Sequence, residues 1–220
     1  MPIANRSSAS FDWLTKLRRE RAIAVIRAPS LPQGLHMAAA VEQAGLRLIE
    51  ITWNSEQPEW LVETLRDRYP HCDIGVGTIL SKDELRAAIA AGAQFACCPH
   101  VDPALIEIAK AANCPIVPGA LSPTEILTAW NAGADGVKVF PADLGGARYI
   151  HNLQGPLGHI PYIPTGGISA DTAAAYLEAG AIAIGVASCL FQAKFLKQQD
   201  WPGLTAHIQA FKQQLDGHRL

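Results

Sequence analysis

Alanine-rich helical stretches alternate along the chain with short runs of apolar, β-favouring residues. At four joints the helical stretch ends in Ala-Gly and an apolar run follows: "QAGLRLIEIT" (43–52), "AAGAQFACCP" (90–99), "NAGADGVKVF" (131–140) and "EAGAIAIGVAS" (178–188). Glycine suits the left-handed position that closes a helix before the chain turns back into a strand. The pattern therefore predicts a repeated strand–helix unit, with successive joints roughly two units apart.

Four further apolar runs bring the number of expected strands to eight. They are "IAVIR" (23–27), "DIGVGT" (73–78), "PIVPG" (115–119) and "YIPTGG" (162–167). All the runs are short and apolar on both faces, which is typical of a parallel sheet covered by helices. Eight such units predict an α/β protein with one (β/α)8 TIM-barrel domain over residues 1–220. A doubly wound open sheet is the alternative, although no G-x-G-x-x-G motif follows the first run.

Helical spacing of apolar residues continues outside the repeat. Residues 11–19 precede the first strand and predict an extra N-terminal helix. Apolar residues at helical spacing between Leu204 and Leu215 predict a further outer helix at the other end of the chain. Residues 1–8 contain no apolar signal core, so we expect a loose tail there and a cytoplasmic protein.

Composition and charge argue against several classes of function. Hydrophobic residues make up 49% of the 220 residues and charged residues 17%, the mixture of a globular protein with a large core. A net charge of -2 without a Lys/Arg-rich run does not favour a nucleic-acid or membrane partner. No apolar run is long enough to span a bilayer. The five cysteines are odd in number and scattered, so neither a disulfide framework nor a metal site is expected.

Two opposite charges lie inside apolar strands. Lys138 stands within "GVKVF" and Glu50 within "LIEIT". The active site of a (β/α)8 barrel lies at the C-terminal ends of its strands, where these residues fall. Burying either charge unpaired is unfavourable by several kcal/mol, which favours a chemical role for the two residues. A structural buried ion pair, or side chains turned outward between helices, are the alternatives.

A lysine among apolar residues suits covalent chemistry with a ketone. Burial is expected to lower the pKa of Lys138 and so to free the neutral amine. That amine attacks a carbonyl to form a Schiff base, whose iminium stabilises a carbanion or enamine on the adjacent carbon. Glu50 could then move protons between the substrate and solvent. Breaking or making a C–C bond next to a 2-oxo acid needs such an electron sink.

A glycine turn adds a candidate anion site. In "PTGGIS" (164–169), Thr165, Gly166 and Gly167 end a strand, and the next helix begins after them. Backbone N–H groups at a helix N-terminus bind phosphate, and the loops after strands seven and eight are the usual phosphate site of a barrel. Strand eight places Gly185 and Ser188 beside this turn. Tight packing is the alternative explanation for the two glycines.

With these residues in place, the sequence resembles the class I 2-keto-3-deoxy-6-phosphogluconate aldolase family, which includes the 4-hydroxy-2-oxoglutarate and phosphogalactonate aldolases. The resemblance runs from about residue 23 to residue 191. It rests on "LIEIT", "GVGTIL", "AGAQFACCP", "IVPGALSPTEI", "GVKVFPA", "PTGGIS" and Ser188.

The resemblance implies roles for individual residues. Lys138, in the K-x-F-P-A motif, would form the Schiff base, and Glu50 would be the general acid/base. Thr78 would help bind the carboxylate of the pyruvyl unit. Phe140 and Thr165 are expected to contact the substrate, and the phosphate-binding positions are Gly166, Gly167, Gly185 and Ser188. The resemblance further implies a homotrimer that needs no metal or cofactor.

One position departs from the family pattern. Phosphogluconate aldolases commonly carry an arginine in an E-x-T-x-R pattern, where it pairs with the substrate carboxylate, whereas this chain has Asn54 there. The Asn-Ser pair is more similar to the phosphogalactonate branch, although Thr52 is not. Arg27, at the end of the first strand, is the best substitute cation for binding the substrate. A surface charge that faces a helix is the alternative for Arg27.

The expected function is therefore a Schiff-base aldolase that cleaves 2-keto-3-deoxy-6-phosphogluconate to pyruvate and glyceraldehyde 3-phosphate. Aldolases for 4-hydroxy-2-oxoglutarate or phosphogalactonate are alternatives, as is an oxaloacetate decarboxylase that uses the same lysine. A phosphate-binding barrel in which Lys138 acts only as a charge, and a non-catalytic binding barrel, are further alternatives.

Overall fold

The computed structural model describes residues 8–217. The helices are α1 (Ser8–Glu20), α2 (Leu31–Gln43), α3 (Pro58–Arg68), α4 (Lys82–Ala90), α5 (Pro103–Ala111), α6 (Pro123–Ala132), α7 (Gly146–Leu157), α8 (Ala170–Glu178), α9 (Ala193–Gln198), α10 (Trp201–Gly217) and the short 3-10 helix η2 (Ala142–Leu144). The strands are β1 (Ala22–Ile26), β2 (Leu48–Thr52), β3 (Asp73–Gly77), β4 (Ala96–Cys97), β5 (Ile116–Val117), β6 (Gly119–Ala120), β7 (Lys138–Val139) and β8 (Ile184–Val186). The loose tail expected at residues 1–8 lies outside the described residues, except that Ser8 begins α1.

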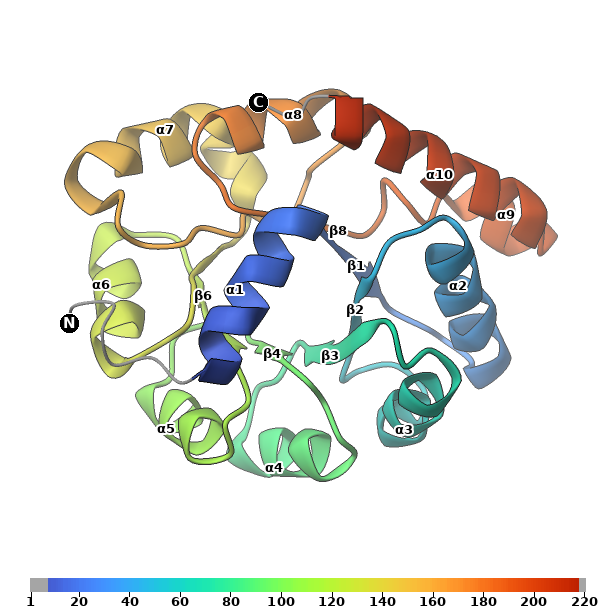
Figure 1. The fold of residues 1–220 in the computed structure, drawn as a ribbon, viewed down its shortest axis with the longest axis horizontal. Coiled ribbons are helices and arrows are strands. Elements are labelled where there is room, and N and C mark those ends of the chain that lie inside the picture. The colour runs from blue at the N-terminus through green and yellow to red at the C-terminus, as the bar shows by residue number, and fades with distance from the viewer. Residues whose placement is uncertain (1–7, 218–220) are drawn as a thin grey trace.

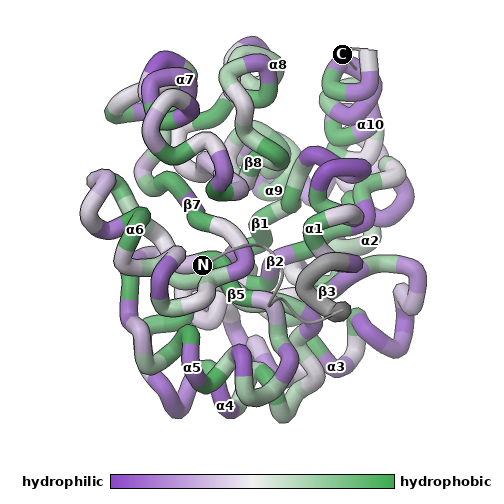
Figure 2. The backbone as a smooth tube through the Cα atoms, turned by 60° about the vertical axis from the view of Figure 1, so that its left-hand side comes forward, coloured by the Kyte–Doolittle hydropathy of each residue, from purple (hydrophilic) through white to green (hydrophobic). Residues whose placement is uncertain are grey.

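The strands run parallel, and the helices surround them (Figure 1). One sheet has the order β5-β4-β3-β2-β1-β8, and a second contains β6 and β7. The α/β class with a parallel sheet is thus confirmed. In Figure 2 the strands are mostly apolar, whereas the helices mix polar and apolar positions, as expected of elements with one face in the core. Within residues 8–217, no helix is both long and apolar enough to cross a membrane.

Prolines change two of the expected strands. The fifth run is divided into β5 and β6 because Pro118 lies between them and has no N–H for the ladder. The seventh run contains Pro164 and appears only as isolated bridges, from Tyr162 to Val137 and from Thr165 to Gly185. The residues on either side of Pro164 still form hydrogen bonds with the neighbouring strand. The Ile163 N–H donates to the Val137 carbonyl, and the Thr165 N–H donates to the Val139 carbonyl.

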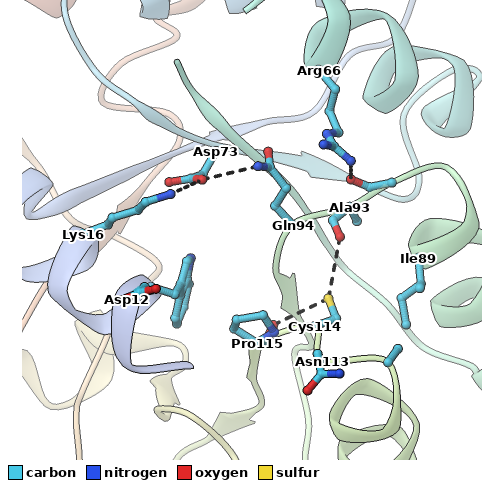
Figure 3. Close-up of a pocket in the computed structure, with 13 residues that line it drawn as sticks. Asp12, Lys16, Arg66, Asp73, Ile89, Ala93, Gln94, Asn113, Cys114 and Pro115 are labelled. Atoms are coloured by element: carbon cyan, nitrogen blue, oxygen red, sulfur yellow. Dashed lines mark hydrogen bonds and ion pairs between the residues drawn. The ribbon is translucent and has the colours of Figure 1, made fainter. Parts of the chain in front are cut away.

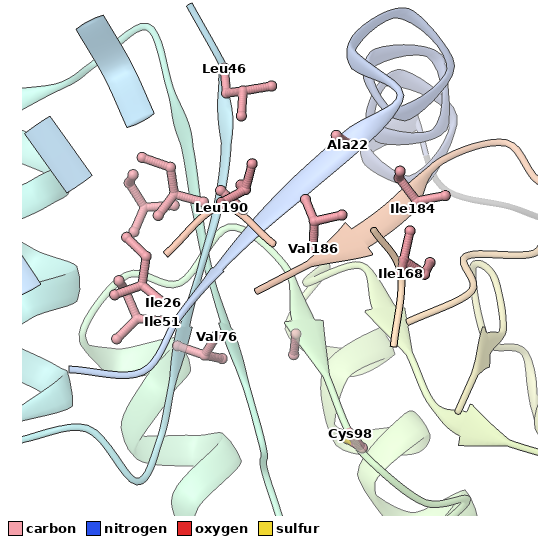
Figure 4. Packing of buried hydrophobic residues seen from close by; sticks show 14 of the residues in the cluster. Ala22, Ile26, Leu46, Ile51, Val76, Cys98, Ile168, Ile184, Val186 and Leu190 are labelled. Carbon is pink, nitrogen blue, oxygen red and sulfur yellow. The ribbon is translucent and has the colours of Figure 1, made fainter. Parts of the chain in front are cut away.

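Alternation along the strands separates two buried clusters. One face of each strand packs against the surrounding helices, for example through Ile26, Ile51 and Val76 (Figure 4). The opposite face forms a smaller interior cluster, in which successive side chains of a strand stand two residues apart. Its members are Trp13, Leu14, Leu17, Ile23, Val25, Leu48, Phe95, Cys97, Val117, Ile163 and Ala183. By this period of two, Glu50 shares the interior face of β2 with Leu48.

Helix α1 lies across the N-terminal end of the strands (Figure 1). Its residues Trp13, Leu14 and Leu17 belong to the interior cluster, so the helix covers that end of the interior. The Lys16 ammonium lies 2.7 Å from a carboxylate oxygen of Asp73, the first residue of β3. These two residues border a pocket of about 440 Å³ that is shown in Figure 3.

The Lys16–Asp73 pair is expected to fasten α1 to the sheet. Lys16→Met should lower the free energy of unfolding by roughly 0.5–1 kcal/mol, because the carboxylate of Asp73 loses its cation while Lys16 is partly exposed. Chemical denaturation measures this effect. Arg19→Met is the matched control, because within residues 8–217 Arg19 pairs only with the neighbouring Glu20. An equal effect of the two substitutions would contradict the prediction.

Candidate active site

Lys138 lies at the start of β7 with its side chain in the interior of the strands. Its backbone N–H donates to the Pro118 carbonyl at 2.9 Å, and β7 pairs with β6 at this residue. The residue is only 7% exposed. Its ammonium nitrogen lies 3.7 Å from Oε1 of Glu50. The alternative in which the two charged side chains turn outward between helices is therefore wrong.

Glu50 occupies the middle of β2, and a glycine on the neighbouring strand makes room for it. The residue is 2% exposed, and no hydrogen-bond partner of its Oε1 is present within residues 8–217. A Cβ atom at Gly77 of β3 would lie 1.7 Å from that oxygen, so any larger residue would displace the carboxylate. The second glycine of "GVGT" thus creates the space in which Glu50 faces Lys138.

The geometry argues against a purely structural ion pair. A buried pair that only stabilises the fold needs close contact and further hydrogen bonds to offset its desolvation. The Lys138–Glu50 separation of 3.7 Å is longer than a hydrogen bond, and Oε1 of Glu50 has no other partner among the described residues. A buried pair that is joined this loosely is better explained by chemistry than by stability.

The expected lowering of the Lys138 pKa is wrong for this site. Burial is the largest single influence and lowers the pKa of Lys138, but the nearby Glu50 carboxylate opposes it, and the net shift of this pKa is upward. The sequence could not show this balance, because it depends on the distance to Glu50. Burial also raises the pKa of Cys97 well above its ordinary value, so that thiol stays protonated near neutral pH.

Phe140 lies close to Lys138, and the Thr165 N–H donates to the carbonyl of the residue after the lysine, Val139. The Lys138 ammonium nitrogen is 5.5 Å from the centroid of the Phe140 ring, and this ring is partly exposed. Thr165 is buried, and a Cβ atom at Gly185 would lie 2.3 Å from its hydroxyl oxygen. The space above Gly185, one of the expected phosphate contacts, is thus filled by the Thr165 side chain.

Thr78 directly follows β3 in a strained backbone conformation. Its φ is 58°, in the left-handed region that β-branched residues rarely adopt. Such a conformation is unfavourable by roughly 1–3 kcal/mol and persists where the surrounding structure enforces it, commonly at functional sites. Hydrogen bonds hold the backbone on both sides of Thr78. The Gly77 carbonyl accepts from the Trp53 N–H, and the Ile79 N–H donates to the Cys97 carbonyl. This strain supports a binding role for Thr78.

Arg27 and Asn54 are exposed residues at the ends of neighbouring strands. Arg27 follows Ile23 and Val25 at a spacing of two, so it continues the interior face of β1. It makes no hydrogen bond or ion pair within the described part of the chain. Ser55, which the sequence analysis missed, fastens the two strand ends together. Its buried hydroxyl oxygen accepts from the Ala28 N–H at 3.0 Å.

The glycine turn has unpaired donors. Gly166 and Gly167 have φ values of 99° and 71°, which only glycine adopts without strain. Their N–H groups have no acceptor among residues 8–217, and α8 begins shortly after them. Ser188 lies in the exposed loop that follows β8. Across residues 8–217, no group of three or more His, Cys, Asp or Glu side chains is arranged to hold a metal.

Comparison with known proteins agrees with this site. The model of an aldolase family, described as KDPG and KHG aldolase, matches residues 14–207. The chain belongs to this family. It is therefore an aldolase, a lyase. A 2-dehydro-3-deoxy-phosphogluconate aldolase of Haemophilus influenzae is 31% identical to it over 86% of this chain and 89% of its own. A 2-dehydro-3-deoxy-6-phosphogalactonate aldolase of Escherichia coli is 30% identical to it over 92% of this chain and 98% of the relative's own length.

Solved structures of aldolases have the same fold. The aldolase resembles a native KDPGal structure with a TM-score of 0.83 and 29% identity, over 90% of this chain and 95% of the other. It also resembles a KDPG aldolase of Legionella pneumophila, in which pyruvate is captured as a covalent carbinolamine, with a TM-score of 0.84 and 25% identity over 93% and 98%.

Glu50 is expected to control the pH at which Lys138 reacts. Because the Glu50 carboxylate raises the pKa of Lys138, Glu50→Gln should lower that pKa and leave burial as the main influence. The rate at which borohydride traps pyruvate on Lys138 should then reach half of its plateau at a lower pH. Glu63→Gln, on the exposed face of α3, is the matched control. A midpoint that does not move, or that rises, would contradict the prediction.

Proposed function

We propose that this aldolase forms a Schiff base between Lys138 and the pyruvyl unit of a 2-keto-3-deoxy acid, with 2-keto-3-deoxy-6-phosphogluconate as the leading substrate. The observation that carries the proposal is the pair of buried, opposite charges, in which the Lys138 ammonium lies 3.7 Å from Oε1 of Glu50, too far for a hydrogen bond. The printed names of the relatives, which are phosphogluconate and phosphogalactonate aldolases, support the substrate class. Aldolases for 4-hydroxy-2-oxoglutarate or phosphogalactonate remain the alternatives.

The two side chains can exchange the protons that the reaction requires. Lys138 must lose a proton before it attacks, and the unpartnered oxygen of Glu50 can receive that proton directly or through a water. The neutral amine adds to the C2 ketone to give a carbinolamine. Glu50 returns the lysine's proton to the carbinolamine hydroxyl, which leaves as water and gives the iminium, and Glu50 is again a carboxylate. Because the pKa of Lys138 is raised, its amine keeps its proton until that proton passes to Glu50 or the bound substrate alters the charges around the lysine.

Cleavage and release then use the same carboxylate. Glu50, as a base, accepts the proton of the C4 hydroxyl while the C3–C4 bond breaks. The bonding electrons pass into the iminium, which becomes an enamine, and the aldehyde departs. Glu50 returns a proton to C3, and water hydrolyses the resulting iminium to pyruvate and free Lys138. Each proton that Glu50 accepts is thus returned within one turnover.

The remaining residues hold the substrate at its two ends. Thr78 and Arg27 stand at the ends of β3 and β1, where they can bind the carboxylate of the pyruvyl unit, and Asn54 lies nearby after β2. Phe140 borders the lysine, and Thr165 lies between the lysine and the glycine turn. The free N–H groups of that turn, with Ser188, would bind the distal phosphate at the start of α8.

The finer architecture is part of this proposal. The bridges from Val137 to Tyr162 and from Thr165 to Gly185 support closure of the two sheets into a (β/α)8 barrel. Helix α1 would then be the extra helix that covers the N-terminal end. A homotrimer and a cytoplasmic location remain predictions from the resemblance and the sequence, and light scattering of the purified protein measures the first.

The central test is chemical trapping. Incubation with pyruvate and borohydride should add one reduced pyruvyl group at Lys138, located by peptide mass, and Lys138→Ala should abolish it. The wild-type protein should also release pyruvate from 2-keto-3-deoxy-6-phosphogluconate. An adduct of equal yield in Lys138→Ala would overturn the Schiff-base assignment. Trapping without cleavage, accompanied by loss of carbon dioxide from oxaloacetate, would instead identify a decarboxylase.

Arg27 is expected to bind the substrate carboxylate. Arg27→Met should raise KM for the keto acid by about 10- to 100-fold, because a hydrogen bond to a charged group contributes roughly 1.5–3 kcal/mol. The value of kcat should change much less. Arg148→Met, an exposed cation on α7, is the control. If steady-state kinetics show an unchanged KM in Arg27→Met, Arg27 does not bind the substrate and is only a surface charge.

A further inference from the structure

His207 joins an outer helix to the loop that follows β8. It lies on α10, and its Nε2 atom is 2.7 Å from the carbonyl oxygen of Cys189. A carbonyl oxygen only accepts hydrogen bonds, so Nε2 of His207 carries a proton and is the donor. The imidazole is partly buried and packs against the ring of Phe195, with 5.5 Å between the ring centroids. Ring packing and a hydrogen bond thus hold His207 against the loop together.

The loop, residues 187–191, forms a hydrogen-bonded turn around Ser188. The N–H groups of Leu190 and Phe191 both donate to the Ala187 carbonyl at 3.0 Å. The side chains of Leu190 and Phe191 are buried, whereas Ser188 is exposed. Within residues 8–217, the bond from His207 is the only hydrogen bond that reaches this loop from another element.

These hydrogen bonds connect His207 to the N–H of Ser188 through two peptide groups. The Cys189 carbonyl, which accepts from His207, shares a peptide group with the Leu190 N–H. The Ala187 carbonyl, which accepts from Leu190, shares a peptide group with the Ser188 N–H. Hydrogen bonds in such a chain polarise one another, so the donor at its end is strengthened. That donor, the Ser188 N–H, has no acceptor among the described residues.

We propose that His207 is a positioning residue for the distal phosphate of the substrate. Its hydrogen bond fixes the turn after β8 and strengthens the Ser188 N–H as a donor to the phosphate. Gly185 of β8 bridges to Thr165, the residue before Gly166, so the two turns follow neighbouring strands. This inference rests on the proposed function for the place of the phosphate. It adds an outer-helix residue that acts on the substrate through the loop and does not touch it.

The first experiment separates the N–H of His207 from its ring. His207→Phe keeps an aromatic ring against Phe195 and removes the donor, so KM for 2-keto-3-deoxy-6-phosphogluconate should rise about five-fold, the effect of one hydrogen bond. The kcat value, the rate of pyruvate trapping on Lys138 and KM for unphosphorylated 2-keto-3-deoxygluconate should change little. His207→Gln should restore most of the affinity, because its amide can donate to the same carbonyl.

His36→Phe is the matched control. His36 also lies against α10, where its ring stacks on Trp201 with 4.6 Å between the centroids. Its hydrogen bond within residues 8–217 goes to the Pro32 carbonyl of its own helix and not to the loop, so this substitution should leave KM for both keto acids unchanged. An unchanged KM for the phosphorylated keto acid in His207→Phe, or an equal rise for both keto acids, overturns the proposal.

The second experiment keeps this inference apart from the proposed function. Binding of inorganic phosphate is measured by calorimetry, which needs no turnover. Wild type should bind phosphate several-fold more tightly than His207→Phe, and His207→Gln should be close to wild type. That result, combined with no cleavage of any keto acid by wild type, would refute the proposed function and support the role of His207. Normal cleavage with equal phosphate affinity in wild type and His207→Phe would do the reverse.

Discussion

The loose pairing of Lys138 with Glu50 is the constraint on which the rest of the site depends. Two opposite charges share an apolar interior, yet their 3.7 Å separation leaves one carboxylate oxygen without a hydrogen bond. A tighter pair would hold the proton on the lysine and leave no room for a reactant. A more distant pair would leave two isolated buried charges, which is far less favourable. The interior faces of β2, β3 and β7 together set this distance, and Gly77 supplies the space.

Much of the fold could be predicted because burial on a parallel sheet leaves a strong pattern. Apolar runs after Ala-Gly joints marked the strands, and spacing alone located α1 and α10. The exceptions are at prolines, where Pro118 divides one strand and Pro164 leaves another as isolated bridges. A proline's missing donor is visible in the sequence. How the neighbouring strand adapts to it is a property of three-dimensional pairing.

The candidate site was only partly accessible to sequence reasoning. Lys138 and Glu50 could be found because a charge in an apolar strand contradicts its surroundings. The direction of the Lys138 pKa could not, since it is decided by the distance to Glu50. The left-handed backbone of Thr78 and the hydroxyl of Ser55 leave no sequence signal. Each of these depends on contacts between residues distant in the chain.

The position of α1 has a consequence for the order of events in catalysis. Because this helix covers the N-terminal end of the interior, a keto acid that reaches Lys138 enters from the C-terminal end of the strands. Its pyruvyl part is then bound innermost and covalently, while the aldehyde part lies toward the entrance. The aldehyde would be the first product to leave and pyruvate the second. In the synthetic direction pyruvate would have to bind before the aldehyde, so the helix and the proposed covalent bond would together impose an ordered kinetic sequence.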